Sequence, residues 1–370
     1  MKKHLYIYML LSALLCMVSC QSDDLPEAPA PDASIWLSAA VATTSQADTR
    51  VPYNPPKSES DTNPYSAPTS NDPFDAAIAA STSGNFTVNN INTTTDLEIL
   101  TSVFFESGEN QLLRGNGVIT NVIYPTSTTD VSPVKFIGLH PNAGWSFSSG
   151  ATNSAPSYTF QGKEDLLYAP QVTGYYLIPS SSYPCLHFYH LLTWLRVEVY
   201  VDEGAESSWG NITSMTLPSK TTLNVNIQSA SVPELDVESG TGKVWFTGAS
   251  SNINFWATGT DPEVAFGSTP YALTTTPTEV AYVLCEPLVA TAEDGGDPTN
   301  EYVITVNTTN RSNVTVNVDL KSDESTYFTG STMGRQFVIQ LKFGAGGYVS
   351  ASALVTEWGV GGFVTKDITE

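Results

Sequence analysis

Short runs of β-branched and aromatic residues recur along most of the chain, each bounded by Gly, Pro, Asn or Ser. From residue 84 onward, no pattern with the 3.6-residue period of a helix extends over a useful length. Short strands at regular intervals, with turn residues between them, are typical of β-sandwiches. The sequence therefore predicts an all-β protein. The expected strands are 86–88, 103–105, 117–124, 134–139, 186–201, 212–217, 222–227, 243–247, 280–284, 302–306, 314–320, 336–343 and 349–356.

The chain has 370 residues, which is room for two domains. A longer strand candidate, 186–201, contains a strict alternation of Leu195, Val197, Val199 and Val201, which places these four side chains on one face of a strand. A polar, Gly-containing break follows at 202–211. We place the domain boundary there and expect two tandem β-sandwiches, at 51–204 and 205–370.

One short segment favours a helix. Asp72 is a good N-cap, Pro73 suits the first turn, and an Ala-rich run extends to Ala80. We expect at most one or two such short helices in the whole chain.

The first twenty residues predict export. Lys2 and Lys3 precede an apolar run at 5–18 that is shorter than the ~20 residues of a spanning helix. The run ends at Met17-Val18-Ser19-Cys20, which resembles a bacterial lipobox, and the acidic stretch 21–24 resembles a surface-export signal. We expect a signal peptide at 1–19 and acylation of the Cys20 thiol, which becomes the mature N-terminus. The alternative is a plain signal peptide with an incidental cysteine.

Residues 20–50 predict a tether followed by one isolated strand. The tether is the Pro/Ala-rich stretch 26–32. In the strand, Ile35, Leu37, Ala39 and Val41 alternate and share one face. A polar, Pro-rich stretch at 42–73 follows and predicts a long irregular loop, which contains Arg50, the only basic residue between Lys3 and Lys57. A strand isolated in this way can leave the fold without disturbing its neighbours.

Composition excludes some functions. The 37 acidic residues outnumber the 15 Lys and Arg, and the formal net charge is -22. Such a surface repels phosphate backbones, so we expect no nucleic-acid partner. After processing, the remaining cysteines are Cys185 and Cys285, both in apolar contexts. We favour two buried thiols, with a disulfide between them as the alternative.

The sequence offers no catalytic or cofactor site. His187 and His190 are three residues apart, so on a strand they face opposite sides and cannot share a metal. The neighbouring carboxylates Glu164 and Asp165 are interpreted as solvated surface rather than a glycosidase pair. The chain also lacks nucleophile-elbow and phosphate-loop motifs. We therefore expect a protein that is not an enzyme and that has no metal and no cofactor.

Five features, in order over nearly the whole chain, resemble the fimbrillins, which are pilus subunits built from lipoprotein precursors by protease-triggered strand exchange. The features are the lipobox at Cys20; the strand Ile35–Val41 followed by Arg50; Glu164-Asp165-Leu166-Leu167-Tyr168-Ala169; Leu186-His187-Phe188-Tyr189-His190 leading into Leu195-Arg196-Val197-Glu198-Val199; and Gly334-Arg335-Gln336-Phe337 with the closing Trp358-Gly359.

The resemblance implies two Greek-key, transthyretin-like sandwiches and a defined maturation. The lipoprotein reaches the outer membrane, and an Arg-specific extracellular protease cuts between Arg50 and Val51. The strand with Ile35, Leu37, Ala39 and Val41 then leaves, and a neighbouring fimbrial subunit fills its place by β-augmentation. The candidate donor is the last strand, with Val349, Ala351, Ala353 and Val355, whose other role is an ordinary strand of the second sandwich.

Two further interpretations stay open. The chain is alternatively a monomeric surface lipoprotein that binds glycans through exposed aromatic residues, with Trp145 and Phe147, or Trp245 and Phe246, as the first candidates. An outer-membrane hydrolase would require a convergent acid/base or metal site. In the fimbrial interpretation, the partners are other subunits, the protease, and receptors on host or bacterial surfaces.

Overall fold

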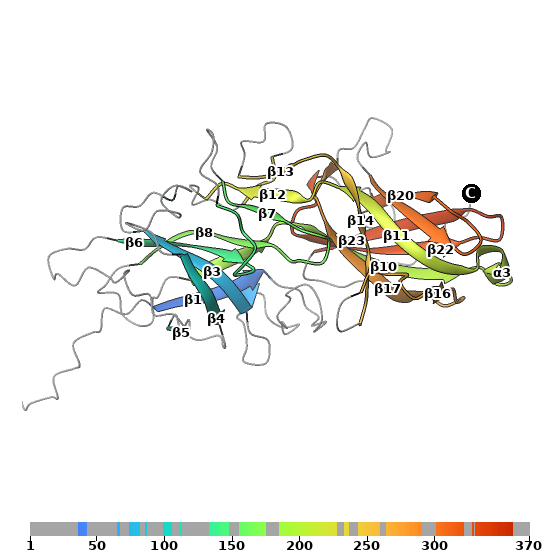
Figure 1. The fold of residues 1–370 in the computed structure, drawn as a ribbon, viewed down its shortest axis with the longest axis horizontal. Helices are drawn as coiled ribbons and strands as arrows, with labels where there is room; N and C mark the ends of the chain where they lie inside the picture. Colours follow the sequence, from blue (N-terminus) through green and yellow to red (C-terminus); the bar gives the residue numbers. More distant parts are fainter. Residues whose placement is uncertain are drawn as a thin grey trace, which may run out of the picture. The chain divides into compact units, whose positions relative to one another are not determined.

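The computed structural model describes residues 36–42, 65–66, 74–81, 86, 99–105, 111–112, 133–147, 155–174, 185–227, 233–236, 243–259, 264–290, 301–321, 328 and 330–357. Within these ranges the chain is mostly β-strand, and its one helix is the four-residue α3 (Glu206–Trp209) (Figure 1). The expected all-β sandwich fold is confirmed. Among the described residues, no helix has the length and apolar character needed to cross a membrane.

The N-terminal sheet has the strand order β2-β1-β9-β8-β6-β3-β4, and β5 also pairs with β1. Its strands are β1 (Trp36–Ala42), β2 (Tyr65–Ser66), β3 (Phe74–Ser81), β4 (Ile99–Phe105), β5 (Gln111–Leu112), β6 (Val134–His140), β8 (Leu167–Gly174) and β9 (Cys185–His190).

The helix expected at 72–80 is wrong, because Phe74–Ser81 forms β3. This strand lies between β4 and β6 and is antiparallel to both. Residues Ala76 to Ala80 are all at most 5% exposed, so both faces of the strand are buried. A helix at the surface would expose one face of this Ala-rich run. Here the small side chains allow close packing on both sides of the sheet, and tertiary burial outweighs the helix propensity of alanine.

The C-terminal sheet has ten strands in the order β14-β11-β19-β20-β23-β22-β10-β17-β15, with β16 also paired to β11. Its strands are β10 (Thr193–Val201), β11 (Asn211–Ser219), β14 (Ser251–Asn254), β15 (Trp256–Ala257), β16 (Tyr271–Ala272), β17 (Thr278–Cys285), β19 (Tyr302–Thr308), β20 (Val314–Lys321), β22 (Arg335–Phe343) and β23 (Val349–Glu357).

The C-terminal sheet closes around its own core. β14 is the first strand of this order and β15 is the last. In the chain, however, a single residue separates them, the fully buried Phe255. One continuous segment therefore forms both ends of the order. The expected alternation in β10 is confirmed, since Leu195, Val197, Val199 and Val201 are all at most 1% exposed and belong to this core.

A small sheet of β7 (Ser157–Thr159), β12 (Thr222–Val225) and β13 (Val244–Thr247) covers one face of the N-terminal sheet, and both contribute to one apolar cluster. A two-stranded sheet joins β18 (Val289–Ala290) to β21 (Gly330–Ser331). Strand pairing crosses the expected boundary at 204/205: β10 belongs to the C-terminal sheet, and β12 pairs with β7. The division into domains at 51–204 and 205–370 stays a prediction.

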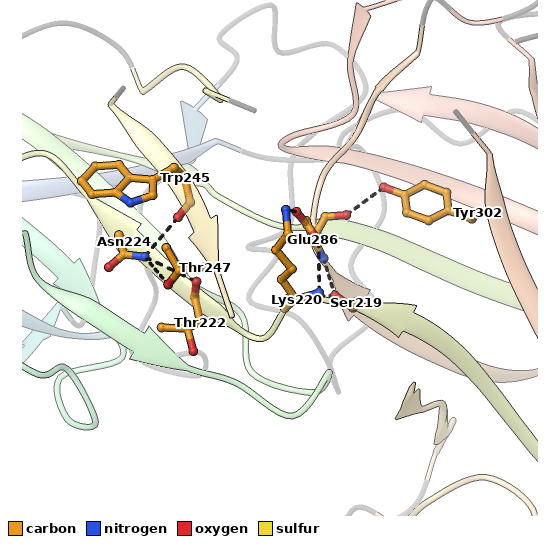
Figure 2. Close-up of polar contacts among 8 residues, drawn as sticks. All are labelled: Ser219, Lys220, Thr222, Asn224, Trp245, Thr247, Glu286 and Tyr302. Carbon is orange, nitrogen blue, oxygen red and sulfur yellow. Dashed lines mark hydrogen bonds and ion pairs between the residues drawn. The ribbon is translucent and has the colours of Figure 1, made fainter. Parts of the chain in front are cut away.

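Glu286 binds the short segment that connects β11 to β12, through contacts with Ser219 and Lys220 (Figure 2). Lys220 Nζ lies 2.9 Å from Glu286 Oε1, and its backbone N–H donates to Oε2 at 3.0 Å. The Glu286 N–H donates to Ser219 Oγ at 3.0 Å, and the Tyr302 hydroxyl donates to the Glu286 carbonyl at 3.2 Å. The chain direction is thus set where it leaves the C-terminal sheet for the small sheet.

Candidate functional site: the first strand and its acceptor edge

β1 has one long partner in the sheet. It runs parallel to β9, with Ser38 to Val41 in register with residues 185–188, and it meets β2 and β5 at only two register positions each. The far side of β9 pairs with β8. The path β9-β8-β6-β3-β4 is therefore continuous without β1, and we call the side of β9 that faces β1 the acceptor edge.

Leu37, Ala39 and Val41 lie within β1, where their spacing of two places them on the same face. Ile35 immediately precedes the described strand. Cys20, Arg50 and Val51 also lie outside the described residues.

Burial alternates along β9. Leu186 and Phe188 are fully buried, His190 is 3% exposed, and His187 between them is exposed. The imidazole of His187 is therefore exposed and that of His190 is buried, as expected for two residues three positions apart on a strand. Phe188 packs against Gly138, where an added Cβ would lie 2.5 Å from the Phe188 Cζ atom. The acceptor edge therefore borders a tightly packed part of the core.

The interpretation of Asp165 as solvated surface is wrong. Asp165 is 7% exposed, and its Oδ1 lies 3.1 Å from Nδ1 of the buried His190, in hydrogen-bonding geometry. Its Oδ2 is 3.0 Å from the same nitrogen but has no hydrogen bond of its own among the described residues. The alternation along β9 places His190 on the same face as Leu186 and Phe188, which is the buried face. A buried imidazole needs a polar partner. That requirement could have identified an acidic residue as its partner.

Glu164 is half-buried. Its Oε2 accepts hydrogen bonds from the backbone N–H groups of Gln161 at 2.7 Å and Lys163 at 3.3 Å. The backbone of this turn therefore binds the Glu164 carboxylate, whereas the neighbouring Asp165 carboxylate is buried.

Three of the features that carry the fimbrillin resemblance meet at the end of β9. Gly334 has a φ of +65°, and an added Cβ there would lie 3.2 Å from the carbonyl oxygen of His190. Its N–H donates to the Leu192 carbonyl at 3.0 Å. The stretches 164–169, 186–190 and 334–337 thus form one junction around the Asp165–His190 pair. The sequence contained each stretch, but their contact depends on the tertiary fold.

The candidate donor strand is β23. It lies between β22, with nine antiparallel register positions, and β20, with three parallel ones. Ala351 and Ala353 are at most 5% exposed and belong to the C-terminal core, while Val349 packs against it. In this chain the strand occupies its ordinary place in the second sandwich, and donation to a neighbour stays a prediction.

Cys285 is a free, fully buried thiol at the end of β17. Burial is the main cause that raises its pKa well above the usual range; the hydrogen bond with Tyr302 lowers the pKa, and the Glu286 carboxylate raises it. Cys185 begins β9. The expectation of a buried thiol is confirmed for Cys285, and its lack of reactivity stays a prediction.

The aromatic pairs proposed as glycan platforms pack inward. Trp245 and Phe246 are 7% and 8% exposed. Trp145 and Phe147 are half-buried against the N-terminal core, and Trp145 packs edge-on against Tyr158 at 5.3 Å. Within the described ranges, no group of three or more His, Cys, Asp or Glu residues is arranged to hold a metal ion.

No protein-family model matches the chain, and no curated protein matches it. Solved structures resemble it at low identity. A "putative cell adhesion protein" from Bacteroides uniformis shares 15% identity over 88% of this chain and all of its own length, with a TM-score of 0.46. Another so named, from Bacteroides ovatus, shares 13% over 90% of this chain and 99% of its own, with a TM-score of 0.49.

A third structure, of "putative polysaccharide binding proteins" from Bacteroides thetaiotaomicron, shares 8% identity over 88% of this chain and 96% of its own, with a TM-score of 0.38. Neither family membership nor function follows from similarities of this size.

Proposed function

We propose that this chain is a structural and adhesive subunit of surface fimbriae, without enzymatic activity or cofactor. It is exported as an outer-membrane lipoprotein acylated at Cys20 and is polymerised by strand exchange after cleavage between Arg50 and Val51. The observation that carries the proposal is the place of β1, which pairs with β9 over four register positions while the path β9-β8-β6-β3-β4 is continuous without it.

Loss of β1 provides a driving force for assembly. It leaves the N–H and C=O groups of the acceptor edge unpaired beside the buried Leu186 and Phe188. A buried polar group without a partner costs about 1–3 kcal/mol, so several such groups make the open subunit unfavourable. An extended segment from another subunit restores the pairing, in the manner of β-augmentation.

Arg50 follows the end of β1 closely in the chain, so a cut there would free the strand from everything that comes after it. An extracellular Arg-specific protease is the partner that this step requires. Exposed polar loops are where proteolytic nicking concentrates, and the 42–73 segment has that composition.

A second candidate is a glycan-binding lipoprotein that is not polymerised. Burial of Trp245 and Phe246 argues against the platforms first considered for it, since a stacking surface must be open to solvent.

The test is the mature N-terminus and assembly state of protein sheared from cells, by intact mass, terminal sequencing and non-boiled electrophoresis. We expect a chain that begins at Val51 and forms a high-molecular-weight ladder. Arg50→Ala should leave a monomer that begins at acylated Cys20, whereas the control Arg114→Ala should assemble normally. A wild-type chain that keeps Cys20 and stays monomeric would contradict the proposal and favour the second candidate.

A further inference from the structure

Three turns meet at one end of the C-terminal sheet, where β10, β19 and β22 end (Figure 1). They are residues 206–210, 309–313 and 344–348, which we call the loop cluster. Three side chains join them by hydrogen bonds to backbone carbonyls: Trp209 Nε1 to Gly344 O, Asn310 Nδ2 to Ser207 O, and Arg311 Nη1 to Gly347 O, each at 2.9 Å. The turns are thus held in a fixed arrangement on a rigid sheet, which is how binding loops are commonly presented.

Arg311 is held in place but keeps part of its hydrogen-bonding capacity. Its Cζ lies 4.3 Å from the ring centroid of the buried Trp209, and its Nη1 donates to Gly347. Its Nε and Nη2 atoms have no hydrogen-bond partner among the described residues, and no described carboxylate pairs with it. Nε–H and Nη2–H together form the fork that binds a carboxylate through two parallel hydrogen bonds.

Four other basic side chains in the described part of the chain are paired with carboxylates. Carboxylates lie within 3.2 Å of the following residues: Arg196, Lys220, Lys243 and Lys342. Arg311 differs from them because a carbonyl and an aromatic ring position it without cancelling its charge. The chain has a net charge of -22, so it would repel a polyanion. Arg311 is a fixed cation in this acidic chain, and it therefore suits a ligand with a single anionic group.

Tyr348 directly follows Gly347, whose carbonyl accepts the hydrogen bond from Arg311, and it is 57% exposed. Its ring rests on the backbone of the same turn: an added Cβ at Gly344 would lie 2.8 Å from Tyr348 Cζ, and one at Gly346 would lie 3.0 Å from Cε1. Gly347, with φ +84°, likewise admits the Arg311 guanidinium, whose Nη1 would lie 2.5 Å from an added Cβ. The glycines of Gly344-Ala345-Gly346-Gly347-Tyr348 therefore seat both groups on one turn.

We propose that the loop cluster binds a saccharide that ends in a carboxylated sugar. The carboxylate accepts two hydrogen bonds from the free Arg311 fork, and the apolar face of the sugar ring packs on Tyr348. The exposed polar side chains of Asn310 and Ser312 lie on the neighbouring turn and suit hydroxyl groups. This inference goes beyond the fimbrial proposal and does not depend on strand exchange, because the site is complete in one chain.

The experiment compares two probes that differ only at one carbon, methyl β-D-glucuronide and methyl β-D-glucoside. Both are titrated by NMR against purified monomeric protein lacking residues 1–19. We expect the glucuronide to bind at least about ten-fold more tightly, as hydrogen bonds to a charged group imply. Arg311→Gln should reduce glucuronide affinity to that of the glucoside, and Tyr348→Ala should weaken binding of both probes.

The matched control is Lys163→Gln, which also removes a cation lying over an aromatic ring, here 4.9 Å from the centroid of Trp256. It should leave glucuronide affinity unchanged. Because Arg311 also joins the turns, near-UV circular dichroism must show that Arg311→Gln keeps the tertiary fold. Tyr348→Ala provides the independent test, since this exposed side chain packs only on its own turn and makes none of the three hydrogen bonds that join the turns.

Three results would overturn the proposal. One is equal affinity for the two probes, or no binding of the glucuronide at about 20 mM, far weaker than useful recognition. Another is glucuronide binding that neither Arg311→Gln nor Tyr348→Ala changes. The third is binding of the acidic peptide acetyl-Glu-Gly-Glu-amide but not of the glucuronide, which would assign the site to protein partners.

Discussion

Replacement of His190 by alanine should destabilise the protein far more than replacement of His187, although both lie on β9. The His190 and Asp165 side chains are only 1% and 4% exposed, and Nδ1 of His190 lies 3.1 Å from Oδ1 of Asp165. His190 supplies the only hydrogen bond to the Asp165 carboxylate found among the described residues. His190→Ala therefore leaves a buried carboxylate without a donor.

The expected magnitude follows from that geometry. Leaving a buried acceptor without its donor costs about 1–3 kcal/mol, so His190→Ala should cost about 3 kcal/mol. Asp165→Asn has almost the same volume and keeps an oxygen that accepts from Nδ1, so it should cost only about 1–2 kcal/mol. The exposed His187 should change the free energy of unfolding by less than about 0.5 kcal/mol when replaced by alanine.

The assay is urea denaturation followed by intrinsic fluorescence, with the free energy taken from midpoint and slope. The double variant Asp165→Ala/His190→Ala then gives the coupling between the two side chains, which we expect to be favourable. If His190→Ala costs less than about 1 kcal/mol, or no more than His187→Ala, the pair does not stabilise the junction and the reasoning fails.

Three further predictions follow from buried groups. Gly138→Ala should lower the free energy of unfolding by about 1–3 kcal/mol, because its Cβ would overlap Phe188, and a thermal melt unchanged from wild type would contradict this. The Cys285 thiol should resist iodoacetamide at pH 8 in the native state and react once urea unfolds the chain, as mass spectrometry can check. Burial also raises the pKa of the Tyr168 and Tyr302 phenols above the ordinary 10.0. The stability that they contribute is therefore present below about pH 10 and is lost as the pH rises further, so the melting temperature should fall between pH 9 and 11, less steeply in Tyr302→Phe.

The sequence predicted what depends on local periodicity and missed what depends on partners distant in the chain. Alternation in β10 correctly identified which side chains enter the core. It could not show that β3 is buried on both faces, so the Ala-rich run was expected to be helical. Likewise, neighbouring carboxylates in a loop are usually solvated, and only the tertiary fold brings Asp165 to His190. Closure of the C-terminal sheet by 251–257 also has no local signature, because it depends on where each half of that segment pairs.

The two sheets differ in what strand exchange would cost them. At the acceptor edge, β1 contributes four register positions with β9, and the strands of the path β9-β8-β6-β3-β4 stay paired when it leaves, while the two-residue strands β2 and β5 lose their pairing with it. β23 contributes nine register positions with β22 and three with β20, and it carries Ala351 and Ala353 into the C-terminal core. Donating β23 would therefore break more backbone pairing in the donor than the acceptor edge restores, and it would open the closed sheet as well. If β23 is the donor, the place that it vacates must itself be refilled. A segment not already paired in this fold would serve as a donor at lower cost, because the whole gain at the acceptor edge would then drive assembly.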